Sequence, residues 1–452
     1  MRLSRLSHSL RDAPAKDMHL GTGTALTFLV RSLSYLLTAA TGIVVARALG
    51  AHGRGVYALV VTIAYLFPAI SSLGISWAGI YLVGQKKCSL QQIISNNLAF
   101  WLVVTALWVS GAVVVGLMRP GFVPDEFRFS YFPIIGLGGS ALLLSSFSKD
   151  LSMAGGSVLG YNAIDVADSL LRTVLIMGGV LILGLGVSGV LSAWLLAIVL
   201  TSTLGGYLIA SRGRPRPSLS LPLLKTQLGF GLRGYLGYLL QTANYRLDVF
   251  FVVAFAGSAT LGQYTVAFGM AEILWLLPVT LGEVLFPKLS GLDPASNTET
   301  AVATCRRLLF IAAIGVLVAV GSGRFLIGHL YGSEFLPAVN AFYILAPSVL
   351  FYTIHKVLGS SLSSRGMPEV NLYAGAASVL VTIGLDLLLI PRVGIEGAAI
   401  ASLAAYTTNA GVIFTMFWLV TRRSPLDILL VNRSDIRSSV HLARTFLARG
   451  EA

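Results

Sequence analysis

The sequence predicts an all-α integral membrane protein with about 12 transmembrane helices in two six-helix lobes, related by a pseudo-two-fold axis along the membrane normal. Three observations predict this fold. Only 11% of the 452 residues are charged, against about 25% in soluble proteins, so a soluble chain of this length could not cover its surface. Apolar stretches long enough to cross a bilayer recur along the chain. The two halves also carry matching glycine motifs.

The apolar stretches define the elements in order, since a helix needs about 20 apolar residues to cross the hydrocarbon. The spans of the predicted N-lobe, 22–210, lie near 22–46, 56–83, 92–117, 131–155, 162–185 and 188–210. The spans of the predicted C-lobe, 229–421, lie near 229–256, 263–287, 305–330, 338–363, 369–390 and 395–420. A basic linker, 211–228, joins the lobes, and basic tails, 1–21 and 422–452, flank them.

The basic excess predicts orientation. The chain carries 32 Lys and Arg against 19 Asp and Glu. If the N-terminus is cytoplasmic, about 20 of the basic residues fall in cytoplasmic segments and about six outside, as the positive-inside rule requires. Both termini are therefore predicted in the cytoplasm. No soluble basic face exists for nucleic acid. The longest outer loop, about 119–130, is too short for a catalytic domain, so an enzyme is not expected.

An internal repeat relates the two halves. The segment 50–58, GAHGRGVYA, matches 257–265, GSATLGQYT, at an offset of 207. Near the end of each half, 186–189, GVSG, matches 394–397, GIEG, at an offset of 208. Because each half contains an even number of spans, both enter the membrane from the same side, as in parallel-repeat transporters. That architecture predicts a substrate site between the lobes near the midplane.

Charged residues inside spans usually face a cavity or a partner, because a charge at a helix centre costs about 2.5–3.5 kcal/mol. Arg31 and Lys356 lie on polar stripes of the first and tenth spans, and Arg246 lies near mid-depth in the seventh. Guanidinium groups bind phosphate bidentately, so these three residues are predicted to bind a phosphate-bearing substrate. For Arg31 and Lys356, snorkelling to the cytoplasmic surface is the alternative.

A second set of charges is predicted to line the cavity or to couple transport to H⁺ or Na⁺: Lys149, Asp165, Asp168, Arg172 and Asp248. The alternatives are local ion pairs, of Lys149 with Asp150 and of Asp168 with Arg172 at i, i+4. Arg47 and Arg54 are predicted at the outer mouth of the cavity. Glu272 and Asp386 lie nearer helix ends, which favours structural hydrogen bonds. No cofactor and no metal site are predicted.

Four segments resemble the polysaccharide flippase family (Wzx type), which serves O-antigen and exopolysaccharide synthesis. It belongs to the superfamily that includes MATE drug exporters and the lipid II flippase. The segments are 46–57, 244–248 with 262–267, 285–290 and 330–338. The resemblance implies two lobes forming a V in the bacterial inner membrane. It also implies that undecaprenyl-diphosphate-linked oligosaccharide moves from the cytoplasmic to the outer leaflet. Basic residues of the first and seventh helices, here Arg31 and Arg246, hold the diphosphate in such proteins. Polysaccharide polymerase and export machinery are the implied partners.

Two other functions remain open from the sequence. A MATE-like ion-coupled drug or cation antiporter shares the fold, but it predicts an acidic cavity, whereas this one is predicted to be basic. A membrane glycosyltransferase or polysaccharide polymerase would need a sizeable outer loop with catalytic acids, and the short outer loops disfavour both enzymes.

Overall fold

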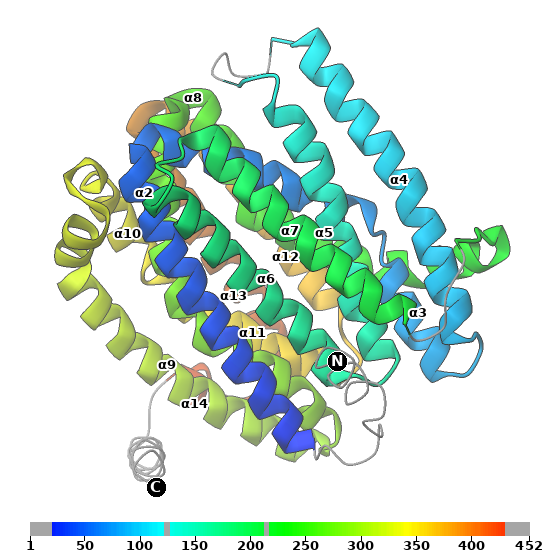
Figure 1. The fold of residues 1–452 in the computed structure, drawn as a ribbon. Coiled ribbons are helices and arrows are strands. Elements are labelled where there is room, and N and C mark those ends of the chain that lie inside the picture. Colours follow the sequence, from blue (N-terminus) through cyan, green and yellow to red (C-terminus); the bar gives the residue numbers. More distant parts are fainter. Residues whose placement is uncertain (1–19, 122–126, 212–216, 430–452) are drawn as a thin grey trace, which may run out of the picture.

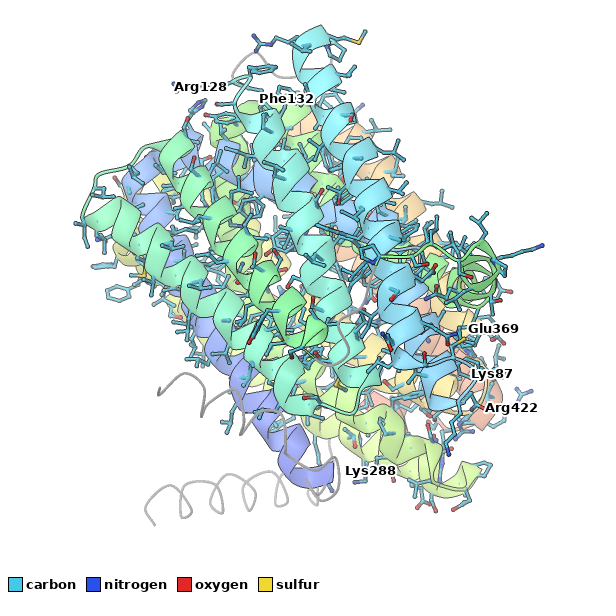
Figure 2. The ribbon with its side chains drawn as sticks, turned by 45° about the vertical axis from the view of Figure 1, so that its right-hand side comes forward. Lys87, Arg128, Phe132, Lys288, Glu369 and Arg422 are labelled. Carbon is cyan, nitrogen blue, oxygen red and sulfur yellow. The ribbon has the colours of Figure 1, made fainter. Side chains whose placement is uncertain are left out.

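The computed structural model describes residues 20–121, 127–211 and 217–429, and the rest of the predicted tails, linker and outer loop lies outside these ranges. The described chain is almost entirely helical, and most of its helices run side by side (Figure 1). With the N-terminus in the cytoplasm, the predicted spans put Lys87, Lys288 and Arg422 on the cytoplasmic side and Arg128 on the outer side. In the structure the first three lie toward one end of the bundle and Arg128 lies at the other (Figure 2). We call these the inner and outer ends.

The N-terminal half supplies six spans. Its helices are α2 (Leu20–Ser71), α3 (Ile75–Gly84), α4 (Leu90–Met118), α5 (Tyr131–Ala154), α6 (Val158–Leu181) and α7 (Val187–Ala210). α2 is broken at Gly50 and provides the first two spans. α3 continues the second span after a turn in which Leu73 and Gly74 have positive φ.

The C-terminal half repeats this plan. Its helices are α8 (Leu221–Ser290), α9 (Pro294–Leu326), η1 (Ile327–Tyr331), η2 (Ser333–Phe335), α10 (Ala338–Leu345), α11 (Ser348–Ser364), α12 (Glu369–Val393), α13 (Ile395–Thr421) and α14 (Pro425–Leu429). α8 is broken at Gly257 and provides two spans. The helices α10 and α11 together form one further span.

Within the described ranges, nine helical segments are long and apolar enough to cross a membrane. Two of these nine segments, in α2 and α8, are broken at a glycine, and each therefore contains two spans. α6 has the length of a span and carries three charges, Asp165, Asp168 and Arg172. The second spans of α2 and α8, together with α6, bring the nine segments to twelve spans in the described chain. This architecture confirms the predicted fold class.

Two helices begin earlier than the apolar stretches predict. α8 begins at Leu221, inside the predicted linker, because the Ser220 side chain accepts a hydrogen bond from the Leu223 amide. α9 begins at Pro294, where Asp293 accepts hydrogen bonds from the amides of Ala295 and Ser296. Polar N-cap residues thus extend both helices beyond the hydrocarbon span.

The matched glycines occupy equivalent positions in the two halves. Gly50 and Gly257 form the breaks in α2 and α8, with φ of 66° and 80° and ψ close to 180°. This region of backbone conformation is open essentially to glycine alone. Gly186 and Gly394 are the N-cap residues of α7 and α13, the last span of each half. The repeat predicted from the sequence therefore coincides with a structural repeat.

α2 and α8 make the main contact between the halves. At the outer end, a Cβ on Gly55 would lie 1.7 Å from the Ser258 carbonyl oxygen, and one on Gly262 would lie 1.9 Å from the Ala51 carbonyl oxygen. Ala51 and Ser258 are themselves related by the offset of 207, so the contact has the symmetry of the repeat. The two backbones touch here, and this crossing closes the outer end between the lobes.

Candidate functional site

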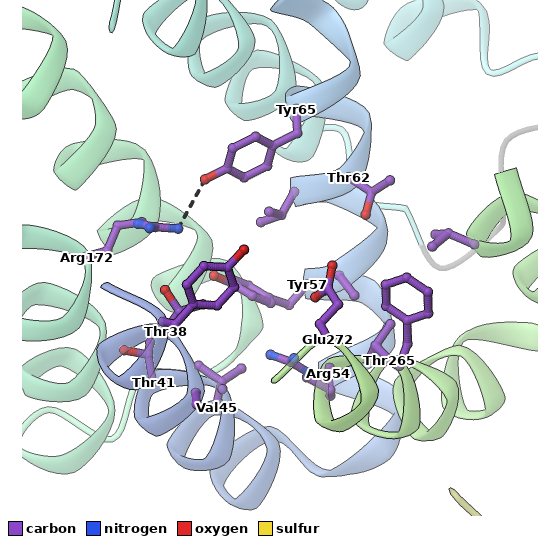
Figure 3. Close-up of a pocket in the computed structure, with 18 of the residues that line it drawn as sticks. Thr38, Thr41, Val45, Arg54, Tyr57, Thr62, Tyr65, Arg172, Thr265 and Glu272 are labelled. Carbon is purple, nitrogen blue, oxygen red and sulfur yellow. Dashed lines mark hydrogen bonds between the residues drawn. The ribbon is translucent and has the colours of Figure 1, made fainter. Parts of the chain in front are cut away.

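A cavity of about 470 Å³ lies between the halves, where the repeat predicts a substrate site. Its walls come from both arms of α2, both arms of α8, and α6, with Tyr331 of η1 toward the outer end. Figure 3 shows side chains from these helices converging on the space. Tyr35 and Ile273 line it and are also more than a third exposed, so the cavity reaches the surface between α2 and α8.

The cavity is unusually rich in arginine for a site within a membrane span. The charged residues that line it are Arg54, Arg172, Arg246, Asp248 and Glu272. Tyrosine and threonine hydroxyls, including those of Tyr57, Tyr65 and Thr38, lie among them. The lining therefore combines charge-assisted donors for an anion with neutral donors and acceptors suited to hydroxyl groups.

Arg54, predicted at the outer mouth, points into the cavity from the second arm of α2 (Figure 3). Its Nε is buried and has no hydrogen-bond partner, and no carboxylate pairs with it anywhere in the described chain. Its guanidinium lies 5.8 Å from the centroid of the Tyr57 ring. A buried donor without an acceptor is costly. The geometry therefore leaves Arg54 ready to bind an anion in the cavity.

Arg172 is already neutralised by its own helix. Its Nη2 lies 3.0 Å from Asp168 Oδ2, one turn earlier on α6, and its Nη1 donates to the Tyr65 hydroxyl at 3.1 Å. The ion pair between Asp168 and Arg172, which the sequence offered as an alternative to a cavity role, is therefore present. Arg172 contributes to the wall of the cavity with its charge compensated.

Arg246 has a looser partner. Its Nη2 lies 3.9 Å from Glu272 Oε1, within ion-pair range but beyond a hydrogen bond. The two side chains are 39% and 37% exposed, and both line the cavity. Glu272 was expected to make structural hydrogen bonds near a helix end. Instead it faces the cavity from the second arm of α8.

Asp248 reaches the cavity wall but is almost fully buried. Its carboxylate accepts hydrogen bonds from the Tyr264 hydroxyl, from the Val249 amide at 2.8 Å and from the Ser402 hydroxyl at 3.5 Å. Asp386 on α12 is fully buried, and neither of its carboxyl oxygens has a hydrogen-bond partner in the described chain.

The remaining candidates lie outside the cavity lining. Lys149 Nζ bonds to Asp165 Oδ1 at 3.0 Å, joining α5 to α6, rather than pairing with Asp150. Arg31 Nη2 donates to the Tyr161 hydroxyl at 3.4 Å. Lys356 lies over the Tyr352 ring, 5.3 Å from its centroid. Of the predicted site residues, the structure thus brings together Arg54, Arg172, Arg246 and Asp248, and it adds Glu272 to them.

Polar contacts between the lobes close the outer end beside the glycine crossing. Arg47 donates to the carbonyl oxygens of His329 and Leu330, the latter at 2.8 Å. The Glu334 carboxylate accepts a hydrogen bond from the Ala51 amide at 2.9 Å. Each charge meets the helix end that its sign favours, since Arg47 lies at the C-terminal end of η1 and Glu334 at the start of the second arm of α2. We call these contacts the outer closure.

The sequence matches a family model described as "Polysaccharide biosynthesis protein" over residues 44–340, about two thirds of the chain. The chain belongs to this family. The match confirms the resemblance seen in the sequence, and the matched range contains the arginines of the cavity together with the outer closure.

Two relatives of this family member come from Haloferax volcanii. The probable low-salt glycan biosynthesis flippase Agl15 is 25% identical over 170 residues, which are 36% of this chain and 35% of Agl15. The probable flippase AglR is 25% identical over 371 residues, 76% of this chain and 74% of AglR. The chain thus spans about a third of the length of Agl15. Both names describe flippases rather than enzymes, in agreement with the expectation from the sequence.

Solved structures show the same fold. The lipid II flippase MurJ in an inward closed conformation superposes with a TM-score of 0.72 at 13% identity, covering 92% of each chain. An inward-facing MATE-family multidrug resistance transporter gives 0.69 at 17% identity, covering 86% of this chain and 94% of the other. The family member therefore has the twelve-helix, two-lobe fold of these two transporters.

Proposed function

We propose that the protein flips a lipid-linked oligosaccharide from the cytoplasmic to the outer leaflet, with undecaprenyl diphosphate as the lipid carrier. The observation that carries the proposal is Arg54, which has a buried, unpartnered Nε and points into a cavity shared with Arg246. The name of Agl15, a probable glycan biosynthesis flippase, supports the same class of substrate, and AglR is also named a probable flippase. A sugar diphosphate cannot cross hydrocarbon unaided, because its charges and hydroxyls would be buried without partners.

In this mechanism the cavity first opens toward the cytoplasm while the outer closure holds the other end shut. Arg54 and Arg246 bind the phosphate oxygens, and tyrosine and threonine hydroxyls of the wall contact the first sugars. The lipid tail stays in the bilayer, leaving through the opening beside Tyr35 and Ile273. Arg31 lies one helical turn from the lining residue Ser34 toward the inner end, so we assign it to the approach of the substrate. Rocking of the lobes then opens the outer end.

Lys356 was also predicted from the sequence to bind the phosphate. It does not line the cavity, so it would have to reach the substrate from beside it. Its ammonium lies over the face of Tyr352, which stacks on Trp275 at a centroid distance of 4.8 Å. This aromatic contact already stabilises the charge. We therefore rank Lys356 below Arg54 and Arg246 as a ligand of the diphosphate.

Coupling to H⁺ or Na⁺ is assigned to Asp248 and Asp386. They lie on facing surfaces of α8 and α12, because Asn244 and Thr382, each one turn earlier, share a hydrogen bond of 2.7 Å. A buried carboxyl without a partner is stable only when it is protonated or binds a cation. An imposed H⁺ or Na⁺ gradient should accelerate flipping by the wild type and not by Asp386→Asn. If Asp386→Asn responds like the wild type, this assignment is wrong.

The test of the substrate site uses export of surface glycan in cells that depend on this protein. Arg54→Gln and Arg246→Gln, expressed at wild-type levels, should each lose most export. Arg423→Gln, which breaks a surface pair with Glu299, serves as the matched control and should retain it. Full export by both cavity variants would refute the anion site.

A MATE-like antiporter of cationic drugs has the same fold and is the second candidate. Three arginines line the cavity, and one of the two acids, Asp248, is buried and hydrogen-bonded. A cationic drug would meet repulsion there, which favours the flippase. Drug susceptibility of a deletion strain separates the two functions, since only the antiporter predicts increased sensitivity.

A further inference from the structure

The three arginines that line the cavity differ in how closely a carboxylate partner approaches them. Arg172 is bound to Asp168 at 3.0 Å, and Arg54 has no carboxylate partner. Arg246 lies between these extremes, with Glu272 at 3.9 Å. This distance is long enough that neither group is committed to the other by a hydrogen bond. Among the described residues that line the cavity, Arg246 and Glu272 therefore form the one ion pair in which another anion could replace the carboxylate.

From this geometry we infer that Glu272 is a built-in counterion of Arg246, which the phosphate group of the substrate displaces. The inference rests on the proposed function, because it concerns how the same site exchanges its anion. Glu272 and Arg246 come from opposite arms of α8, on either side of the break at Gly257. Glu272 therefore meets Arg246 from the other arm of the helix, and a change of side-chain rotamer can separate the pair without unwinding either arm.

The physical reason is the cost of an uncompensated charge at this depth. A charged arginine within a span is costly, and a nearby anion lowers that cost. When substrate is bound, phosphate oxygens fill this role at the 2.7–2.9 Å typical of charge-assisted hydrogen bonds. When the cavity is empty, Glu272 fills it at 3.9 Å. A phosphate at the typical distance would bind Arg246 more strongly than Glu272 does at 3.9 Å, so the substrate is expected to displace the carboxylate.

Glu272 also affects the bound state, because its carboxylate and the phosphate would repel each other at this range. Figure 3 shows Glu272 and Arg54 pointing into the same space from α8 and α2. The carboxylate must therefore turn away or take up a proton as the substrate enters. Glu272 thus weakens substrate binding and speeds the return of the empty carrier, two effects that a purely structural residue would not combine.

The test measures affinity and turnover separately. The full-length protein in nanodiscs is titrated with a short-chain polyprenyl-diphospho-N-acetylglucosamine, and turnover is followed in proteoliposomes with a long-chain lipid-linked glycan. Glu272→Gln should bind the probe roughly fivefold more tightly, the value of a partly exposed ion pair, and turn over several-fold more slowly. Glu299→Gln, which breaks the surface pair with Arg423, should change neither quantity.

Failure of the inference can be told from failure of the proposed function. If Arg246→Gln and Arg54→Gln weaken probe binding but Glu272→Gln does not tighten it, the site is real and the counterion role is wrong. Unchanged turnover in Glu272→Gln also overturns the role. If the wild type does not bind the probe, or if both arginine variants bind it as tightly as the wild type, the proposed function itself fails.

Discussion

The crossing of α2 and α8 at the outer end yields a prediction that depends on one methyl group. A Cβ on Gly55 would lie 1.7 Å from the Ser258 carbonyl oxygen, so Gly55→Ala forces the two helices apart by about 1.5 Å to reach normal contact. Overpacking of this kind costs about 1–3 kcal/mol. Because the cost falls only on the state with the outer end closed, the population with an open outer end should rise about 5–150-fold.

Spin labels at Ile182 and Val393 report this change, since both are exposed at the outer end, one in each lobe. The distance distribution of the variant, measured by double electron–electron resonance, should gain a longer component. Gly411→Ala is the matched control, because no heavy atom lies within 4 Å of a Cβ added there. If the variant has the distance distribution and thermal stability of the wild type, the closed crossing is not part of the conformational cycle.

Two further predictions separate gating from structural roles. Glu334→Ala removes the acceptor of the Ala51 amide and should cost about 1 kcal/mol, as loss of a helix cap does, enriching the open outer end by the same spectroscopic measurement. Glu396→Ala, which breaks a bond to Asn340 within the C-terminal half, should not. Lys149→Met leaves Asp165 without its partner and should lower the free energy of unfolding by about 1–3 kcal/mol, the cost of leaving a partly buried polar group without its hydrogen bond. Its affinity for the diphosphate probe should stay within twofold of the wild type, whereas a tenfold loss would place Lys149 in the binding site.

The fold could be predicted because its signals are local. The length of an apolar stretch marks a span, and the glycines of the repeat, such as Gly50 and Gly257, mark the breaks between spans. The helix starts were less predictable, because capping residues such as Ser220 and Asp293 lengthen a helix beyond its apolar stretch. A hydropathy pattern contains no information about such polar extensions.

The candidate site was only partly predictable, because which side chains pair between the arms of α2 and α8 depends on how the helices pack in the folded protein. Arg246 and Asp248 were expected near the cavity, since they lie at mid-depth in a span. Arg54 was expected at the outer mouth because it follows Gly50 closely in sequence, but the arm that carries it turns back into the bundle. Nothing in the local sequence of Glu272 or Asp386 shows that the first meets an arginine and the second meets no partner.

We propose that arginines of an inter-lobe cavity carry a phosphate-linked glycan lipid across the membrane. The direct test is a leaflet assay in proteoliposomes containing a fluorescent undecaprenyl-diphosphate oligosaccharide, with the outward-accessible fraction followed over time. The wild type should equilibrate the lipid between leaflets. The Arg54→Gln, Arg246→Gln double variant should be slower by about 100-fold, the loss of two charge-assisted hydrogen bonds. Equal rates for the wild type and the double variant would contradict the claim.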